Sequence, residues 1–146
     1  MPASTFPTPE AAETAFYAAF EARSLDAMMA VWASDDSIAC IHPMTAPLNG
    51  RTAVAAGWHS MFEAADRFSV QVEIAHQIRE SGQVIHIVRE YIAIGQETEP
   101  RPPILATNVY RKETDGGWRI VLHHASPPQI GRARLNSSHR TTSYAV

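Results

Sequence analysis

The spacing of apolar residues changes once along this chain, close to Asp66, and the change divides the sequence into two halves. Before it, apolar residues recur every three or four positions, and after it they alternate with polar residues. The first period is that of an amphipathic helix and the second that of a half-buried strand. The sequence therefore predicts an α+β fold with its helices in the first half and its main strands in the second.

Three helix starts are visible in the first half. Thr8 is followed by Pro9, and a hydroxyl cap before a proline at the first helical position is a strong start signal. Ser24 is predicted to cap a second helix, which Asp35 and Asp36 end, and Thr52 is predicted to cap a third. Along the first of these helices the apolar residues form one stripe, made of Ala12, Ala15, Phe16, Ala19 and Phe20.

Five strands are expected, over residues 37–42, 68–74, 84–94, 104–111 and 118–125. Short turns join the last four, which favours antiparallel pairing. We therefore expect a curved antiparallel sheet wrapped around three N-terminal helices, as a cone whose open mouth can receive a ligand. The domain is predicted to span residues 8–127, between a flexible arm, 1–7, and a flexible tail, 128–146, whose composition also fits residues appended for expression.

Composition narrows the function classes. The chain has 146 residues and a formal net charge of −3, so it suits one domain and lacks the basic excess typical of nucleic-acid binding. Its single cysteine, Cys40, cannot form an internal disulfide. No signal peptide or membrane-length apolar stretch is visible, so we expect a cytoplasmic protein with no membrane partner.

Several short motifs occur in an order that resembles the SnoaL-like group of the nuclear transport factor 2-like superfamily. They are Phe16–Phe20, Ser24–Asp26, Ile41–Pro43, Leu48–Arg51 and Trp118–Ser126. The resemblance covers residues 8–127 and implies a cone-shaped α+β barrel. The superfamily includes ketosteroid isomerases, polyketide cyclases, dehydratases, kinase association domains and catalytically silent carriers, so the resemblance does not choose among these functions.

The resemblance also implies roles for particular residues. In the ketosteroid isomerase branch a carboxylate base precedes the proline that ends the first strand, and here His42 stands at that position. The branch's protonated acid on the penultimate strand corresponds to Asn108. Its tyrosine on the first helix corresponds to Phe16, which cannot donate a hydrogen bond, while Tyr17 lies about 100° around the helix. Kinase association domains place arginines in the cone, and Arg89 corresponds to one of them.

Two adjacent histidines on the last strand must point to opposite faces of the sheet, so only one can enter a site. By the resemblance, His123 faces the cone interior with Asn108 and Arg89, and His42 lies at the rim. Tyr91 shares the face of Arg89, and the predicted ligand wall is made of Trp58, Phe62 and Phe16.

This set predicts proton transfer next to a carbonyl. His42 would exchange the proton, Asn108 would donate to the carbonyl oxygen, Arg89 would hold an anionic group, and His123 would orient the ligand or act as a second acid. No cofactor and no metal is predicted, because the histidines lack companion ligands at a recognisable spacing.

The same residues can also have purely structural roles. Arg89 can instead pair with Glu13, Glu21 or Glu73, His42 can satisfy loop carbonyls, and Trp58 and Phe62 can be ordinary core residues. The sequence therefore leaves two hypotheses: a cofactor-free isomerase, cyclase or dehydratase, and a non-catalytic ligand-binding or association domain.

An apolar outer sheet face predicts a homodimer. The residues expected on that face are Val84, Val88, Ile92, Val109, Trp118, Ile120 and Leu122.

Overall fold

The computed structural model describes residues 5–128 and has the predicted order of two helices, a short strand, a third helix and four further strands, with one additional short strand, Leu48–Asn49, where a loop was predicted. The helices are α1 (Pro9–Ala22), α2 (Leu25–Val31) and α3 (Arg51–Glu63). The strands are β1 (Ala39–Ile41), β2 (Leu48–Asn49), β3 (Phe68–Arg79), β4 (Gln83–Ile94), β5 (Ile104–Lys112) and β6 (Trp118–Ala125). The predicted tail lies outside the described residues except for residue 128, and so does most of the predicted arm.

Two of the three predicted helix caps are confirmed. The Thr8 hydroxyl accepts a hydrogen bond from the Ala11 amide at 3.0 Å, and the Ser24 hydroxyl accepts one from the Ala27 amide at 3.1 Å. The third prediction was wrong, because α3 begins at Arg51, before Thr52. Its first amide, that of Arg51, donates to the Asp36 carboxylate at 3.0 Å instead. A distant acid therefore replaces the local cap, which periodicity alone could not indicate.

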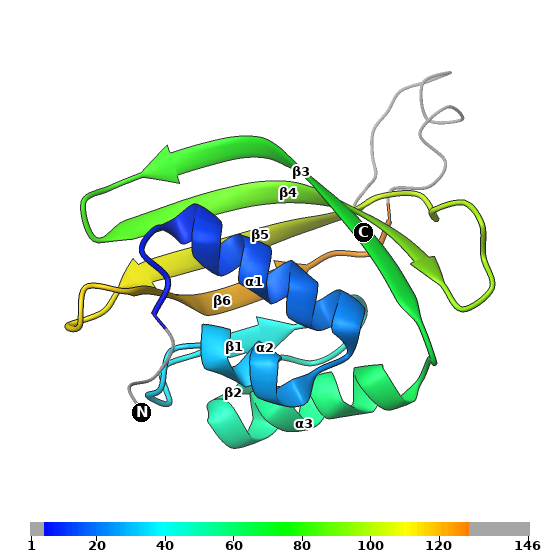
Figure 1. Cartoon of the computed structure of the whole chain (residues 1–146), viewed down its shortest axis with the longest axis horizontal. Coiled ribbons are helices and arrows are strands. Elements are labelled where there is room, and N and C mark those ends of the chain that lie inside the picture. The colour runs from blue at the N-terminus through cyan, green and yellow to red at the C-terminus, as the bar shows by residue number, and fades with distance from the viewer. Residues whose placement is uncertain (1–4, 129–146) are drawn as a thin grey trace.

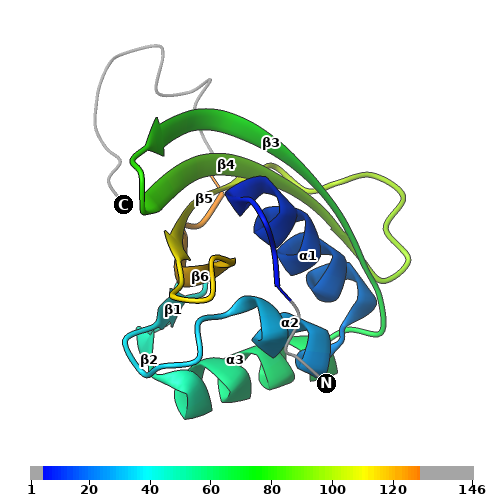
Figure 2. The ribbon, with the colours of Figure 1, turned by 60° about the vertical axis from the view of Figure 1, so that its left-hand side comes forward.

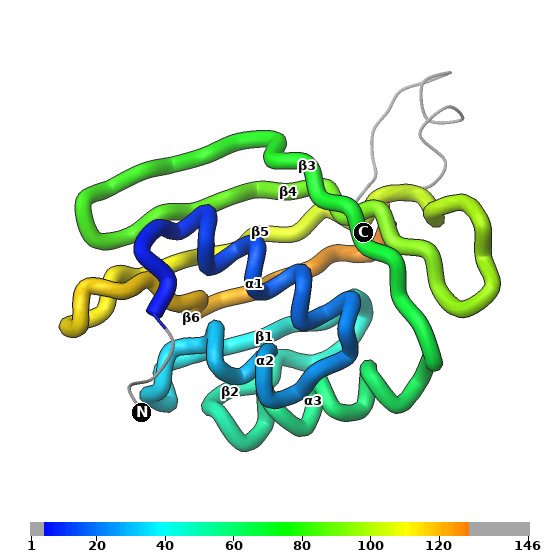
Figure 3. The backbone as a smooth tube through the Cα atoms, viewed as in Figure 1, coloured from blue at the N-terminus to red at the C-terminus, as the bar shows by residue number. Residues whose placement is uncertain are grey.

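All six strands belong to one curved, unclosed sheet in the order β2-β1-β6-β5-β4-β3. Figure 1 shows α1 lying across this sheet, and Figure 2 shows all three helices on its concave side. The tube in Figure 3 follows the long β3–β4 hairpin as it curves over α1. The predicted α+β architecture is confirmed, with one difference: β1 pairs with β6 in parallel, so the sheet is not wholly antiparallel.

Two register shifts change which side chains face the helices. One lies in β3 between Ile74 and His76, and the other lies where β5 pairs with β6. In the second, Val109 pairs with Leu122 but Tyr110 pairs with Ile120, so β6 contains one extra residue, Val121. Such a bulge reverses the alternation of side chains. As a result Ile120 and His123 both face the concave side although they are three positions apart.

The predicted outer apolar face was therefore partly wrong. Val84, Val88, Ile92, Trp118 and Ile120 are buried in the core, each at most 8% exposed. Val109 and Leu122 do occupy the convex face, and both are half-buried. For the β4 residues the error arose because β4 is apolar on much of both faces, so that alternation did not identify the buried side. For Ile120 it arose from the bulge in β6.

An aromatic cluster joins the three layers of the core. Phe20 of α1 packs edge-on against Trp58 of α3 and Phe68 of β3, each with ring centroids 5.2 Å apart. Phe16 reaches Trp58 from the same helix, with ring centroids 5.4 Å apart. This cluster fixes α1 and α3 on the concave face of the sheet. Within residues 5–128, no helix is long and apolar enough to cross a membrane.

Candidate functional site

Three of the residues predicted for the site lie together on the concave side. Asn108 is fully buried, and His123 and His42 are 2% and 7% exposed. The His123 and Asn108 side chains share a hydrogen bond of 2.5 Å between Nδ1 and Oδ1. The rings of His42 and His123 lie 6.4 Å apart. His124 is exposed, as the alternation of the histidine pair predicts.

Arg89 and Tyr91 do not join them, and their predicted place in the interior was wrong. Both lie on the convex face, where Glu73 accepts from the Arg89 guanidinium at 3.4 Å and from the Tyr91 hydroxyl at 3.2 Å. The pairing of Arg89 with Glu73 was one of the structural alternatives. The choice of face failed because β4 carries apolar residues on both sides.

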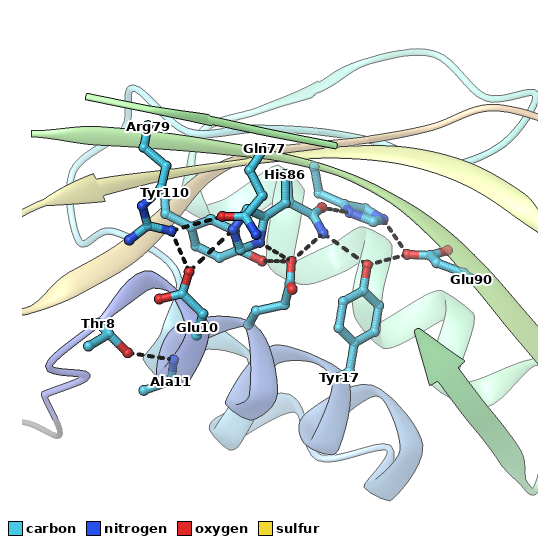
Figure 4. A network of polar contacts seen from close by, with 12 residues as sticks. Thr8, Glu10, Ala11, Tyr17, Gln77, Arg79, His86, Glu90 and Tyr110 are labelled. Atoms are coloured by element: carbon cyan, nitrogen blue, oxygen red, sulfur yellow. Dashed lines mark hydrogen bonds and ion pairs between the residues drawn. The ribbon is translucent and has the colours of Figure 1, made fainter. Parts of the chain in front are cut away.

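Glu90 of β4 occupies the concave side instead. Its side chain is 2% exposed and accepts a hydrogen bond of 2.6 Å from the Tyr17 hydroxyl of α1. The Tyr17 oxygen in turn accepts one of 2.9 Å from the Asn108 amide. The Nε2 atom of His123 lies 3.9 Å from the Glu90 carboxyl. Figure 4 shows Tyr17 reaching from the helix to Glu90 on the sheet.

A second branch of the same network surrounds Glu13 of α1. One oxygen of its carboxylate accepts from the Tyr110 hydroxyl at 2.8 Å and lies 3.0 Å from His86 Nδ1. The Asn108 amide lies 3.5 Å from this oxygen, so Asn108 connects the two branches. Buried polar groups that satisfy one another in this way hold their positions firmly.

Burial decides the protonation of the site. It raises the pKa of Glu90 to about 7; the hydrogen bond from Tyr17 offsets part of this increase, and the charge of Glu13 adds a smaller one. Burial lowers the pKa of His42 to about 4 and that of His123 to about 3. Near neutral pH both imidazoles are therefore neutral, and Glu90 is the group in this cluster that exchanges a proton readily.

The hydrogen bonds also fix the orientation of the amide and the imidazole. The Asn108 nitrogen donates to Tyr17 and Glu13, so its oxygen faces His123 and must accept a hydrogen bond. His123 consequently carries its proton on Nδ1, and its Nε2 is left as an acceptor toward Glu90. Because both amide hydrogens are engaged, Asn108 positions its neighbours and has no free donor for a carbonyl oxygen.

The predicted aromatic wall lies beside this cluster. Trp58 packs edge-on against His42, with ring centroids 4.7 Å apart, and its indole nitrogen has no hydrogen-bond partner among the described residues. Phe16 lies 5.0 Å from the His123 ring, and Phe62 lies 5.6 Å from Trp58. All three aromatic residues are also core residues, so the structural alternative accounts for their burial equally well.

Cys40 lies next to His42, with its sulfur 3.6 Å from Nε2. Burial raises the pKa of its thiol well above the usual range, which disfavours the thiolate needed for nucleophilic attack. Across residues 5–128, no group of three or more histidine, cysteine or carboxylate side chains is arranged to hold a metal ion.

Sequence reasoning missed Glu13, Tyr17, His86 and Glu90. Glu13 and Tyr17 are four positions apart and border the apolar stripe of α1, which was a usable signal that both face the sheet. His86 and Glu90 alternate with Val84, Val88 and Ile92. They could have been found only with the correct face of β4.

The helices, the curved sheet and the buried acid–base cluster define a cone-shaped α+β domain with polar groups at its centre. A family model described as the SnoaL-like domain matches residues 10–130. The chain therefore belongs to the SnoaL-like domain family.

Two solved bacterial structures are similar over most of the chain. One, from Thiobacillus denitrificans, is named provisionally as a calcium/calmodulin-dependent protein kinase type II association domain. It is 71% identical with a TM-score of 0.83, over 86% of this chain and 99% of that one. The other, from Streptomyces avermitilis, is named provisionally as a dehydratase of the NTF2-like family. It is 25% identical with a TM-score of 0.71, over 82% of this chain and 92% of that one.

A curated plant protein is also similar in sequence to this chain. F-box protein SKIP8 of Arabidopsis thaliana is 26% identical over 113 residues, or 77% of this chain. The chain spans 46% of the length of that curated relative.

Proposed function

We propose that the domain is a cofactor-free acid–base enzyme of the isomerase, cyclase or dehydratase type, which acts on a small molecule next to a carbonyl group. The observation that carries the proposal is Glu90, a buried carboxyl whose pKa is raised to about 7 by burial. A general base is most effective when its pKa lies near the working pH. The dehydratase name of the Streptomyces relative supports the same reaction class.

The residues around Glu90 suggest a division of roles. Glu90 would take a proton from a carbon next to the carbonyl and return it at another position. Tyr17 donates to the Glu90 carboxylate and so keeps it oriented. Asn108 holds Tyr17 and His123 in place. His42, neutral near pH 7, would contact the ligand as a hydrogen-bonding group rather than as the proton carrier.

The charge of the interior narrows the ligand class. The Arg89 side chain lies on the convex face, opposite to that of Glu90, so the guanidinium that was predicted to hold an anionic ligand is absent from the concave side. The carboxyls of Glu90 and Glu13 are both buried on the concave side and would repel a carboxylate ligand. An uncharged ketone or hydroxyketone fits this site better than an anion does.

The proposal is tested by hydrogen exchange on candidate ligands. We expect a thermal-shift screen to find a ring ketone or hydroxyketone that stabilises the protein, while simple carboxylates do not. In D2O the protein should then catalyse loss of the proton next to the carbonyl, measured by ¹H NMR. Glu90→Gln should slow this exchange about 100-fold, because a proton-transfer group contributes 10²–10⁴-fold.

Exposed Glu63 provides the matched control, and Glu63→Gln should leave the exchange rate unchanged. A ketone that binds without any exchange above the buffer rate would support the binding-domain alternative. An exchange rate that survives Glu90→Gln would remove Glu90 from the mechanism.

The second candidate function is association with another copy of the chain. The 71% identical Thiobacillus protein carries an association-domain name, which favours this alternative. The convex face also exposes apolar side chains, with Ile78 44% and Leu105 39% exposed. An apolar sheet face of this kind is a common surface for a homodimer.

A homodimer formed through the convex face should be weakened at least tenfold by Ile78→Glu, because a buried unpaired charge is costly at an interface. Analytical ultracentrifugation across a concentration series measures the change. Met44→Glu is the control, since Met44 is 86% exposed in a loop away from the sheet. A monomeric wild-type protein at all concentrations would count against the association function.

A further inference from the structure

The indole nitrogen of Trp58 is a buried hydrogen-bond donor without a protein acceptor. The Trp58 side chain is fully buried on α3, and its Nε1 atom has no partner among residues 5–128. Buried tryptophan N–H groups usually find a partner, because a donor that is removed from water and left unpaired is costly. An unpaired donor in the core of a domain therefore requires an explanation.

Trp58 lies directly against the cluster that surrounds Glu90. Its ring centroid is 4.7 Å from that of His42 and 5.8 Å from that of His123. The Nε2 atom of His123 lies 3.9 Å from the Glu90 carboxyl, so the imidazole that contacts Trp58 also borders the proposed base. The other aromatic rings that pack against Trp58 in the described part of the chain carry no oxygen or nitrogen acceptor, and they are those of Phe16, Phe20 and Phe62.

We propose that Trp58 is a ligand-contacting residue, whose Nε1–H donates a hydrogen bond to the carbonyl oxygen of the ring ketone or hydroxyketone on which Glu90 acts. The inference rests on the proposed function and adds the group that binds the carbonyl. When the Glu90 carboxylate takes the proton from the neighbouring carbon, the C–H electron pair forms the C=C bond of an enolate. The carbonyl π pair moves onto the oxygen, where the Trp58 N–H stabilises the negative charge until Glu90 returns the proton to carbon.

The other donors of the cluster are already engaged. The Tyr17 hydroxyl donates to Glu90 at 2.6 Å. The hydrogens of the Asn108 amide are directed at Tyr17 and Glu13, and the Nδ1 proton of His123 is directed at the Asn108 oxygen. A carbonyl oxygen in this cluster therefore finds no free donor among these three side chains.

His42 is the rival donor. It is 7% exposed, and its Nε2 lies 3.6 Å from the Cys40 sulfur. Its need for a partner is thus met in part by the protein, whereas no described residue meets that of the Trp58 N–H. A ligand oxygen that paired with Trp58 would remove the cost of the unpaired donor, which gives the indole the larger gain from binding.

Two other buried nitrogens lack a partner among residues 5–128, Nε1 of Trp32 and Nε2 of His86. The Trp32 ring packs against Phe16, with centroids 6.3 Å apart, and has no ring contact with either imidazole of the cluster. Trp58 thus combines an unpaired donor with contact to the proposed acid–base groups. Trp32 supplies a control with the same side chain and the same unpaired nitrogen.

The indole ¹H–¹⁵N signals of the full chain, labelled with ¹⁵N-tryptophan, test the proposal. The chain has three tryptophans, and Trp32→Phe and Trp118→Phe assign all three signals. Cyclohexanone and 2-hydroxycyclohexanone are the probes, and each should move the Trp58 N–H proton downfield, as a new hydrogen bond to oxygen does, while the Trp32 signal stays in place. Methylenecyclohexane has nearly the same shape without an acceptor oxygen, so it should not cause this shift.

Trp58→Phe keeps an aromatic ring and removes the donor. The dissociation constant of cyclohexanone should rise about tenfold more than that of methylenecyclohexane, because the ketone oxygen is then buried without a partner. Trp32→Phe is the matched control and should leave the ratio of the two constants unchanged. A merely structural Trp58 would weaken the binding of both compounds equally.

A Trp58 signal that neither ketone moves overturns the proposal, and so does an unchanged ratio in Trp58→Phe. If Trp58→Phe fails to fold, the titration of the wild-type protein decides. These readouts do not depend on turnover. A ketone that moves the Trp58 signal without hydrogen exchange leaves Trp58 as the carbonyl contact of a binding domain and counts against the enzyme. Exchange without the shift supports the enzyme and removes Trp58 from it.

Discussion

Replacing Phe16 with alanine is expected to lower the free energy of unfolding by about 3–5 kcal/mol. The Phe16 side chain is fully buried where α1 meets the sheet and α3. Its ring lies 4.8 Å from that of Tyr17, 5.0 Å from that of His123 and 6.3 Å from that of Trp32. A cavity at this point removes contacts from all three neighbours, and the surrounding rings cannot close it without leaving their own positions.

Urea unfolding followed by far-UV circular dichroism measures this loss. Phe16→Leu keeps most of the volume and should cost less than about 1.5 kcal/mol. Met44→Ala is the surface control, because Met44 is 86% exposed and lies outside the convex face, and we expect a change below about 1 kcal/mol. All comparisons need equal protein concentration, since an associating protein changes its apparent stability with concentration. A Phe16→Ala loss below about 1 kcal/mol would contradict the packing described for α1.

Local signals were sufficient to predict most of the fold. The Thr8–Pro9 pair located the start of α1, and the alternation after Asp66 located β3. The last strand occupies the predicted residues 118–125. These features depend on capping and on period, both of which are local properties of a sequence. The parallel pairing of β1 with β6 depends on how the chain returns to the sheet, and no local sequence pattern predicts this pairing.

The side of β4 that faces the helices could not be found in the same way. Ile85 and Ile87 are as apolar as Val84 and Val88, so alternation alone supports either choice. The family resemblance favoured Arg89, but that residue is exposed and Glu90 is buried. A one-residue choice moves every side chain of a strand to the other face. The error therefore affected Arg89, Tyr91 and the β4 residues of the predicted outer face together.

The candidate site was predicted only in part for the same reason. Asn108 and His123 come from strands whose buried face was chosen correctly, and they form a hydrogen bond. The neighbouring carboxyl group, that of Glu90, belongs to β4, whose buried face was predicted wrongly. Its altered proton affinity depends on burial and on Glu13 from a different element, 77 positions earlier in the sequence. The electrostatic effect of one element's charges on another's cannot be predicted from the sequence until the relative positions of the two elements are known.

Glu90→Gln is expected to become increasingly stabilising as the pH rises from about 4.5 to about 7. The folded protein holds the Glu90 proton more tightly than the unfolded chain does, because burial raises the pKa from 4.5 to about 7. Between these values the folded state carries the proton and the unfolded state has lost it. The stability of the wild-type protein from this group therefore falls across that window, by about 3 kcal/mol in total at 1.36 kcal/mol per unit.

His42 and His123 act in the opposite direction. Burial lowers their pKa values to about 4 and about 3, so the unfolded chain binds more protons than the folded one below pH 6.5. Their contribution raises stability with pH and masks that of Glu90 in the wild-type curve alone. Both imidazoles remain in Glu90→Gln, so their effect cancels when the two curves are subtracted.

The measurement is therefore a difference between two pH series of urea unfolding, for the wild-type protein and for Glu90→Gln, from pH 4 to pH 8. The difference should increase in favour of the variant by about 3 kcal/mol between pH 4.5 and pH 7 and stay constant outside that range. Glu63→Gln, an exposed substitution of the same chemistry, should give a nearly flat difference. A flat difference for Glu90→Gln would mean that Glu90 ionises normally in the folded protein. In that case its proposed role as the base could not stand, because that role requires a carboxyl that holds its proton to near neutral pH.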